Sequence, residues 1–280
     1  MKIIKQNKAF DGQVQVWSHA SEMTRSQMTF SAFQPSRPTG VLWVWLSGLT
    51  CDHERFFIKS GALALKKAAE LGWTILCPDT SPRGCVESDG LGWDIGEGAS
   101  FYLDATKQPW AKHFRMFSYL HHELRPMALE SWGLDTSACV ISGHSMGGYG
   151  ALLAGLKTDF YRSASALSPI CSPNSCAWGQ KAFQTYLQNP EVESEQWDPL
   201  FLMQNPVTEH QTPLFIEQGL SDEFYPEQLQ TKQIERVGQS SKYPVMKVRF
   251  QEGYDHSYYT VSSFLDGHID FHRSYLQDKS

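Results

Sequence analysis

The sequence predicts an α/β protein with a mostly parallel central sheet, an antiparallel N-terminal edge, and helices on both faces of the sheet. Two observations support this prediction. The first 35 residues contain stretches in which apolar and polar side chains alternate, and the rest of the chain alternates short apolar runs with helical stretches. The charge of the chain and the length of its apolar runs then argue against nucleic-acid binding and a membrane span.

The N-terminal edge is predicted from residues 14–17 and 28–33, where apolar and polar side chains alternate as in antiparallel strands. The turn-forming residues 35–40, which include two prolines and a glycine, close this part of the chain. We therefore expect a hairpin-like edge before the main sheet begins.

Five later segments are short and apolar, as expected of strands buried on both faces: 41–46, 73–77, 138–141, 213–216 and the looser 245–250. Helical stretches lie between them at 59–71, where Gly72 is placed as a C-cap, at 110–130 and at 151–157. This order predicts a parallel sheet whose reactive groups collect at the carboxyl ends of its strands.

Composition and charge exclude several classes of protein. No repeat, low-complexity tract or long linker marks a boundary, so we expect a single domain over residues 1–280. With 24 basic against 30 acidic residues, the formal charge of −6 disfavours a nucleic-acid binder. The longest strongly apolar run, 41–46, is far too short to span a bilayer. Because no apolar signal core follows the basic start, a cytoplasmic location is expected.

The cysteines and histidines give no sign of a metal site. Six cysteines without an export signal indicate reduced thiols, and no Cys-x-x-Cys pair occurs. The run His121-His122-Glu123 lacks the i, i+4 histidine spacing of a helical zinc site, so a solvated helix face is predicted there. We expect neither a metal nor a cofactor.

The strongest functional signal is Gly143-His144-Ser145-Met146-Gly147, directly after the apolar run 138–141. A G-x-S-x-G match is weak alone, but a strand, small residues beside the serine and a following helix are what a nucleophile elbow requires. Such a turn would raise the Ser145 hydroxyl above the sheet edge. The alternative is an ordinary glycine-rich turn.

A serine nucleophile needs a base and a carboxylate that orients the base, and in α/β-hydrolases these follow the serine in that order. Asp222 follows the apolar run 213–216, and His256 follows the last one. Asp255 and Glu223 are rival acids, and Asp255 is disfavoured because neighbouring side chains on an extended loop point apart. We assign His144 to packing or hydrogen bonding within the elbow.

The tetrahedral intermediate also needs two hydrogen-bond donors for its oxyanion. One is normally the amide of the residue after the nucleophile, here the Met146 N–H. The second should come from the loop after the strand at 41–46, where Leu49 N–H is favoured.

Five longer motifs carry a resemblance to a known family: WLSGLTC (45–51), PDTSPRG (78–84), GHSMGG (143–148), WGQKAF (178–183) and GYDHSYY (253–259). Together they resemble S-formylglutathione hydrolase, the esterase D family of α/β-hydrolases, essentially from end to end. Departures occur at Tyr149, Ser172 and Ala177, where the family usually has His, Asn and Pro.

The resemblance implies a cytosolic serine thioesterase that hydrolyses S-formylglutathione to formate and glutathione through a formyl-serine intermediate, the last step of glutathione-dependent formaldehyde detoxification. It implies no metal, common dimer formation, and side activity on small aryl esters. Carried over by motif, Ser145, Asp222 and His256 form the triad, and Leu49 and Met146 supply the oxyanion amides.

The substrate pocket is less determined. Cys51 would place its thiol near the acyl pocket if its loop is compact, either as a small buried side chain or as a site where modification blocks entry. Trp178 is either a pocket wall or part of the core. Candidate contacts for the glutathione carboxylates are Lys59, Arg83 and Lys181, although solubility or structural ion pairs also explain them.

Two other functions stay open from the sequence. The same triad would serve a general carboxylesterase for short esters. A binding protein on a hydrolase scaffold that has lost its chemistry is a further alternative, against which the complete Ser145, Asp222 and His256 set argues.

Overall fold

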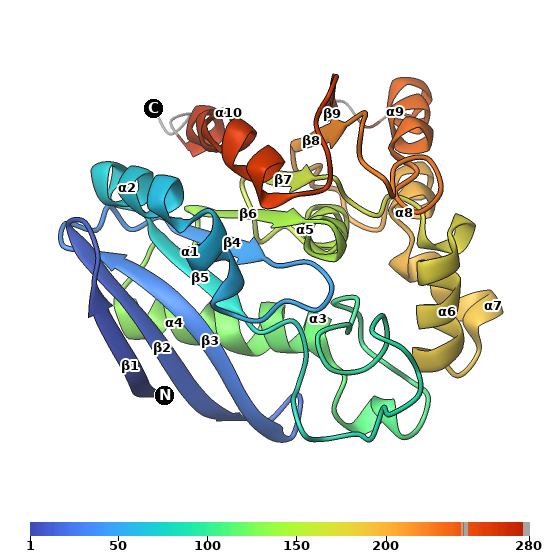
Figure 1. Cartoon of the computed structure of the whole chain (residues 1–280), viewed down its shortest axis with the longest axis horizontal. Coiled ribbons are helices and arrows are strands. Elements are labelled where there is room, and N and C mark those ends of the chain that lie inside the picture. The colour runs from blue at the N-terminus through green and yellow to red at the C-terminus, as the bar shows by residue number, and fades with distance from the viewer. Residues whose placement is uncertain (242, 244–245, 277–280) are drawn as a thin grey trace.

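The computed structural model describes residues 1–241, 243 and 246–276. One nine-stranded sheet runs through the molecule in the order β1-β2-β3-β5-β4-β6-β7-β8-β9 (Figure 1). Its strands are β1 (Lys2–Lys8), β2 (Gly12–Ser21), β3 (Ser26–Pro35), β4 (Leu42–Leu46), β5 (Thr74–Pro78), β6 (Cys139–His144), β7 (Ala164–Leu167), β8 (Leu214–Gly219) and β9 (Met246–Gln251).

The pairing confirms the predicted fold class. β1, β2 and β3 pair antiparallel, and β3 joins β5 in the same way. All pairs from β5 through β4 to β9 are parallel. The carboxyl ends of β4, β6, β8 and β9 therefore meet at one edge of the sheet, where the loops that follow them converge.

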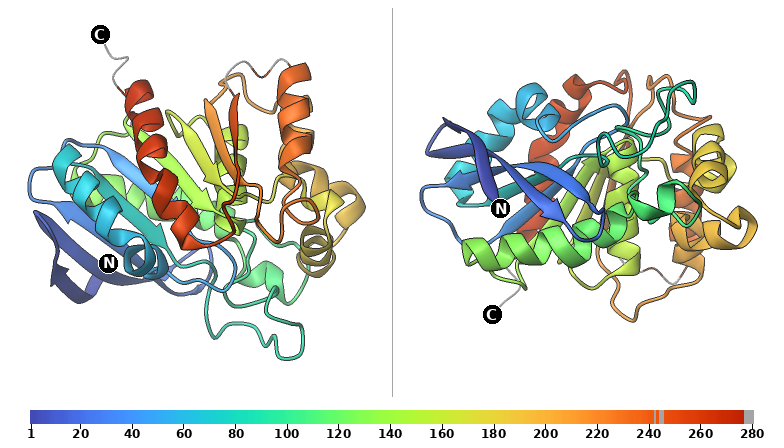
Figure 2. Two further views of the ribbon diagram at one scale, coloured as in Figure 1. Left: turned by 45° about the horizontal axis from the view of Figure 1, so that its top comes forward. Right: turned by 90° about the horizontal axis from the view of Figure 1, so that it is seen from below.

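Helices cover both faces (Figure 2). They are α1 (Arg55–Lys59), α2 (Gly61–Leu71), α3 (Met116–Ser118), α4 (Arg125–Trp132), α5 (Met146–Lys157), α6 (Ala177–Tyr186), α7 (Pro190–Glu193), α8 (Pro199–Gln204), α9 (Thr231–Ser240) and α10 (Tyr258–Leu276). Short 3₁₀ segments are η1 (Trp110–Lys112), η3 (Pro173–Ser175) and η4 (Ser194–Trp197), and η2 (Tyr119–Leu124) is a π-helical turn.

Alternation along β4 divides the core between the two faces. Trp43 and Trp45 pack with side chains of α1, α2 and α10 on one face, whereas Leu42, Val44 and Leu46 pack with η2, α4 and α5 on the other. Because every residue of β4 is buried, its near-continuous apolar sequence reflects a strand covered on both sides.

The predicted helix boundaries hold only in part. The 59–71 stretch begins earlier, as α1, and breaks at Ser60 before α2, while Gly72 is confirmed as a left-handed C-cap with φ of 70°. The 151–157 helix begins at Met146 instead. Neither β1 nor β7 was predicted, and Val245, the start of the predicted last strand, lies outside the described residues.

The prediction of one helix over 110–130 is wrong. After η1 the chain becomes extended, since Ala105 N–H bonds to Phe114 O and Arg115 forms a β-bridge with Asp104. The helix resumes only at Met116. Its π-helical turn lies just before Pro126, which has no backbone N–H to donate and whose ring crowds the previous turn.

The solvated face predicted for residues 121–123 holds only for His122, which is exposed. His121 is buried, its Nδ1 lies 3.0 Å from the Tyr161 hydroxyl, and burial lowers its pKa to about 3. The Glu123 carboxylate accepts hydrogen bonds from the Ser21 hydroxyl and the Met23 amide. In the described residues no group of three or more His, Cys, Asp or Glu side chains is placed to hold a metal ion.

The sequence predicted reduced thiols and no segment long enough to span a membrane. All six cysteines are free thiols. Among the described residues, no helix combines the length and apolar character needed to cross a membrane.

Candidate active site

The turn between β6 and α5 has the backbone geometry of a nucleophile elbow. Ser145 has φ of 58° and ψ of −121°, a strained conformation for a non-glycine residue. A Cβ at Gly143 would lie 2.1 Å from Gly147 O, and one at Gly147 would lie 2.0 Å from Leu46 O. The two glycines are therefore required by close backbone contacts, which explains the spacing of the motif.

The loops after β8 and β9 bring a carboxylate and an imidazole together. His256 Nδ1 lies 2.6 Å from Asp222 Oδ2, and the Asp222 side chain is completely buried. Phe224 N–H donates to Asp222 Oδ1 at 2.9 Å, and Gln218 Nε2 donates to Oδ2 at 3.3 Å. With three donors directed at it, Asp222 is held as an acceptor that orients the ring.

The rival acids lie elsewhere. Asp255 Oδ1 accepts from the Ser257 amide, the Ser257 hydroxyl and Thr260 Oγ1, so this carboxylate binds the start of α10 instead of His256. These hydrogen bonds lower the pKa of Asp255. Glu223 is exposed, with no side-chain partner among the described residues. The geometry therefore favours Asp222 over both.

His144 packs against the imidazole of His256. The two ring centroids lie 4.6 Å apart, and the Tyr258 ring lies 5.4 Å from His144 on the same wall. Burial lowers the pKa of His144 well below its usual value, with the neighbouring His256 adding to the effect. A neutral ring at this position packs against His256 without placing a positive charge beside it.

The loop after β4 is held against the elbow. Tyr102 Oη donates to Ser47 O at 2.9 Å, and Thr50 N–H, at a residue with φ of 64°, donates to Gly98 O at 2.9 Å. A Cβ at Gly48 would lie 3.1 Å from that of Ser145, so the loop passes directly beside the serine. Leu49 N–H has no hydrogen-bond acceptor in the described part of the chain.

Met146 N–H is an amide of the first turn of α5, for which the helix itself provides no acceptor. The amides of Leu49 and Met146 therefore lie on two segments that converge on Ser145.

These segments enclose a cavity of about 280 Å³. It is lined by Gly48, Leu49, Thr50, Cys51, Trp93, His144, Ser145, Trp178, Phe224, His256 and Tyr258. Ser145 and His256 share this cavity, although no hydrogen bond joins their side chains among the residues described here. Such contacts are often long before substrate binds.

Residues 21–271 match the protein family described as "Putative esterase". The chain belongs to this esterase family. An S-formylglutathione hydrolase from Agrobacterium tumefaciens is 37% identical and superposes with a TM-score of 0.92, covering 99% of this chain and 100% of its own.

Two more distant structures share the fold of this esterase. A fluorophosphonate-binding serine hydrolase of Staphylococcus aureus is 17% identical, with a TM-score of 0.72 and coverage of 94% and 99%. An S-formylglutathione hydrolase of the same species is 16% identical, with a TM-score of 0.67 and coverage of 92% and 97%. The protein is thus an α/β-hydrolase and a serine hydrolase enzyme, which sets aside the binding-protein alternative.

Cys51 faces the esterase pocket as a protonated thiol. Burial is the main cause that raises its pKa, and this outweighs the opposing effect of Arg55. A thiol with a raised pKa is a poor nucleophile. It contributes a small apolar surface beside Ser145.

The candidate cations are mostly engaged within the protein. Arg83 pairs with Asp79 at 2.7 Å, and Lys181 pairs with Asp94 at 2.5 Å. Of the three candidates, Lys59 on α1 is the one that is exposed without a side-chain partner among the described residues. The ion pairs support the structural interpretation of Arg83 and Lys181.

The sequence did not single out three residues of the pocket wall, namely Trp93, Phe224 and Tyr258. Tyr258 lies within the 253–259 motif, and Phe224 follows Asp222 by two residues, so both had a positional signal. Trp93 had none, because a long irregular segment separates it from every strand end.

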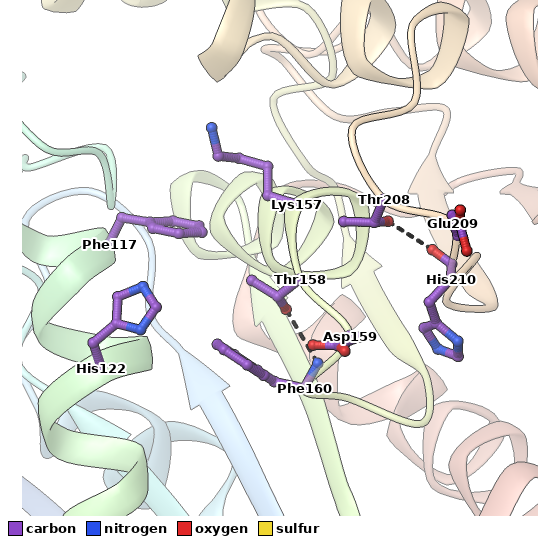
Figure 3. A pocket seen from close by; sticks show the side chains of 9 residues that line it. All are labelled: Phe117, His122, Lys157, Thr158, Asp159, Phe160, Thr208, Glu209 and His210. Atoms are coloured by element: carbon purple, nitrogen blue, oxygen red, sulfur yellow. Dashed lines mark hydrogen bonds between the residues drawn. The ribbon is translucent and has the colours of Figure 1, made fainter.

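A larger hollow of about 630 Å³ lies at the other end of α5 (Figure 3). Lys157, at the last position of the helix, donates to Gln196 O at 2.8 Å and lies 4.3 Å from the centre of the Trp197 ring. Burial lowers its pKa to about 8. The residues lining this hollow include neither a serine nor a cysteine, so the smaller cavity is the better candidate for the hydrolytic site.

Proposed function

We propose that this esterase is a cytoplasmic thioesterase that hydrolyses S-formylglutathione to formate and glutathione, and so completes formaldehyde detoxification. The observation that carries the proposal is the Asp222–His256 pair at 2.6 Å, which shares one cavity with Ser145 on its strained elbow. The 37% identical S-formylglutathione hydrolase, matched over nearly the whole chain, supports the substrate.

In the first half of the reaction, Ser145 Oγ attacks the formyl carbonyl while His256 Nε2 takes its proton. Asp222 holds the His256 Nδ1–H and stabilises the imidazolium that forms. The amides of Leu49 and Met146 bind the oxyanion. The C–S bond then breaks, glutathione leaves as the thiol after receiving the proton, and a formyl-serine ester remains.

In the second half, His256 takes a proton from water, and the resulting hydroxide attacks the formyl ester. The tetrahedral intermediate collapses to formic acid, which ionises to formate in water, and Ser145 recovers its proton from His256. A thiolate is a good leaving group, so catalysis depends more on the nucleophile and the oxyanion donors than on protonation of the leaving group. All of these groups belong to the chain, and the proposed reaction needs no metal or cofactor.

A general carboxylesterase for short esters is the second candidate. The aromatic wall of Trp178 and Phe224 favours it, because such a surface also suits aryl leaving groups. We propose short aryl esters as side substrates. We further propose one domain, since a single sheet joins β1 to β9, and a homodimer, to be tested by sedimentation.

The test compares kcat/KM for S-formylglutathione and nitrophenyl acetate in the wild type and in Ser145→Ala. We expect a clear preference for the thioester and a loss of several orders of magnitude in the variant with its melting temperature preserved. A preference for the ester would favour the carboxylesterase, and near-full activity of the variant would contradict the mechanism.

A further inference from the structure

Four aromatic rings form a continuous row from the catalytic base to the mouth of the pocket. The Phe224 ring meets His256 edge-on at 4.9 Å, Trp178 lies 4.8 Å from Phe224, and Trp93 meets Trp178 edge-on at 5.5 Å. Trp93 lines the cavity although it is 56% exposed, so its ring forms part of the rim. An exposed tryptophan beside a pocket offers a stacking surface to a ligand.

The row begins at the group that must reach the leaving group. His256 Nε2 donates the proton to the departing sulfur, so the thiol side of a thioester lies against this imidazole. The one-carbon formyl group is held at Ser145, where the oxyanion amides converge. A tripeptide thiol is much larger than the formyl group, and the row of Phe224, Trp178 and Trp93 offers it a contact surface between His256 and the solvent.

The turn that carries Trp93 is docked on α6. Lys181 Nζ donates to Leu91 O at 2.7 Å and pairs with Asp94, so it bridges the two sides of the turn around Gly92. Gly92 has φ of 94°, and a Cβ there would lie 3.1 Å from Lys181 Nζ. The turn therefore closes tightly around the ammonium group.

Two further side chains of the same helix contact this segment. Trp178 lies one turn before Lys181 and meets Trp93 directly. Near the end of α6, Tyr186 Oη accepts from Gly96 N–H at 2.8 Å and donates to Ala99 O at 2.7 Å. The helix thus fixes residues 91–99 at the mouth of the pocket.

We propose that Trp93 is a specificity-determining residue that binds the thiol portion of the substrate, and that Lys181 is the positioning residue that holds it there. This inference deepens the proposed function and rests on it. It also gives Lys181 a role different from direct contact with a glutathione carboxylate, because its ammonium group is already bound by Leu91 and Asp94.

The experiment uses formyl thioesters of glutathione and of 2-mercaptoethanol, which share the acyl group and differ in the thiol. The ratio of their kcat/KM values is measured for the wild type, Trp93→Ala, Lys181→Gln and the double variant. Phe10→Ala is the matched control, because Phe10 is an aromatic residue, 50% exposed, in the β1–β2 turn at the opposite edge of the sheet.

We expect Trp93→Ala to lower the ratio about tenfold, mainly through a higher KM for the glutathione thioester, as for truncation of a binding tryptophan. Lys181→Gln should lower it about threefold and add less than about twofold in the Trp93→Ala background, because it acts through the same ring. Phe10→Ala should leave the ratio unchanged.

A wild-type preference for the glutathione thioester that survives Trp93→Ala would overturn the assignment of Trp93 and leave the proposed function intact. Independent, multiplying effects of the two substitutions would overturn the positioning role of Lys181. A wild type that hydrolyses both thioesters equally well would contradict S-formylglutathione as the preferred substrate, and the inference would fall with it.

Discussion

Replacing Asp222 by asparagine is the most direct test of the acid in the triad. Both carboxylate oxygens accept from N–H groups, Oδ1 from Phe224 and Oδ2 from His256 and Gln218. Asparagine has one carbonyl oxygen and one NH₂ group, so it cannot accept at both positions. Whichever way the amide turns, one set of donors meets another donor.

The two orientations have different consequences. With the NH₂ group toward Phe224, a partly buried amide loses its acceptor at a cost of about 1–3 kcal/mol. With the NH₂ group toward His256, Gln218 Nε2 loses a contact of 3.3 Å but keeps its hydrogen bond to Gly219 O at 2.9 Å. The His256 ring must then carry its proton on Nε2, where it can no longer accept one from Ser145. Since the second orientation avoids the clash at Phe224, most molecules adopt the inactive tautomer.

We therefore expect Asp222→Asn to lower kcat by about 10³ to 10⁴, the size of loss known for a wrong tautomer in a serine triad. Steady-state kinetics on S-formylglutathione and nitrophenyl acetate measure this loss, and thermal unfolding shows whether the fold persists. Glu223→Gln should stay within about twofold of the wild type, because Glu223 is exposed and outside the pocket.

Asp255→Asn is the second control. The asparagine carbonyl oxygen can still accept the three hydrogen bonds that Asp255 Oδ1 accepts, so we expect the melting temperature to stay close to that of the wild type, with a far smaller effect on kcat than Asp222→Asn. The reasoning would be refuted if Asp222→Asn kept kcat within tenfold of the wild type, or if either control lost more activity.

Three further predictions concern other parts of the molecule. Gly147→Ala should abolish activity and destabilise the fold by about 3 kcal/mol or more, because the added Cβ would lie 2.0 Å from Leu46 O. Gly61→Ala is the control, since a Cβ there has no contact under 3.6 Å, and urea unfolding should find it as stable as the wild type. His121 is neutral in the folded protein because its pKa is lowered to about 3, so protonation of His121 in the unfolded chain lowers the free energy of unfolding as the pH falls from 6.5 toward 3. His121→Asn should make the free energy of unfolding less dependent on pH in this range. An unchanged slope would contradict the assignment. Lys157, whose pKa is lowered to about 8, should react with acetic anhydride at pH 8 faster than the exposed Lys59, as measured by peptide mass spectrometry, and equal rates would exclude a desolvated amine.

The elbow and the order of its partners were predictable because they depend on local sequence. Gly143 and Gly147 flank a serine between an apolar run and a helix. Both positions require glycine, because the backbone approaches each of them too closely for a Cβ atom. Asp222 and His256 each follow an apolar strand, so the parallel topology alone brings them to one edge of the sheet.

Other features required the tertiary contacts. The helical pattern of 110–130 is broken where Arg115 pairs with Asp104, because a strand-like contact across the fold replaces local hydrogen bonds there. His121 has the sequence context of a surface residue, but Tyr161 and the core enclose it. Burial of this kind depends on which elements pack together. The polar run His121-His122-Glu123 therefore does not indicate by itself that His121 is buried.

The sequence by itself therefore determined the chemistry of this esterase, through residue types whose spacing follows from strand, turn and helix geometry. Only the tertiary structure decided which carboxylate holds His256, which cations are already paired, and which rings form the pocket wall. Trp93 reaches the pocket because Lys181 and Tyr186, almost a hundred residues later, hold its turn against α6. Such long-range contacts have no periodicity along the chain, since packing and not local backbone preference brings the two segments together.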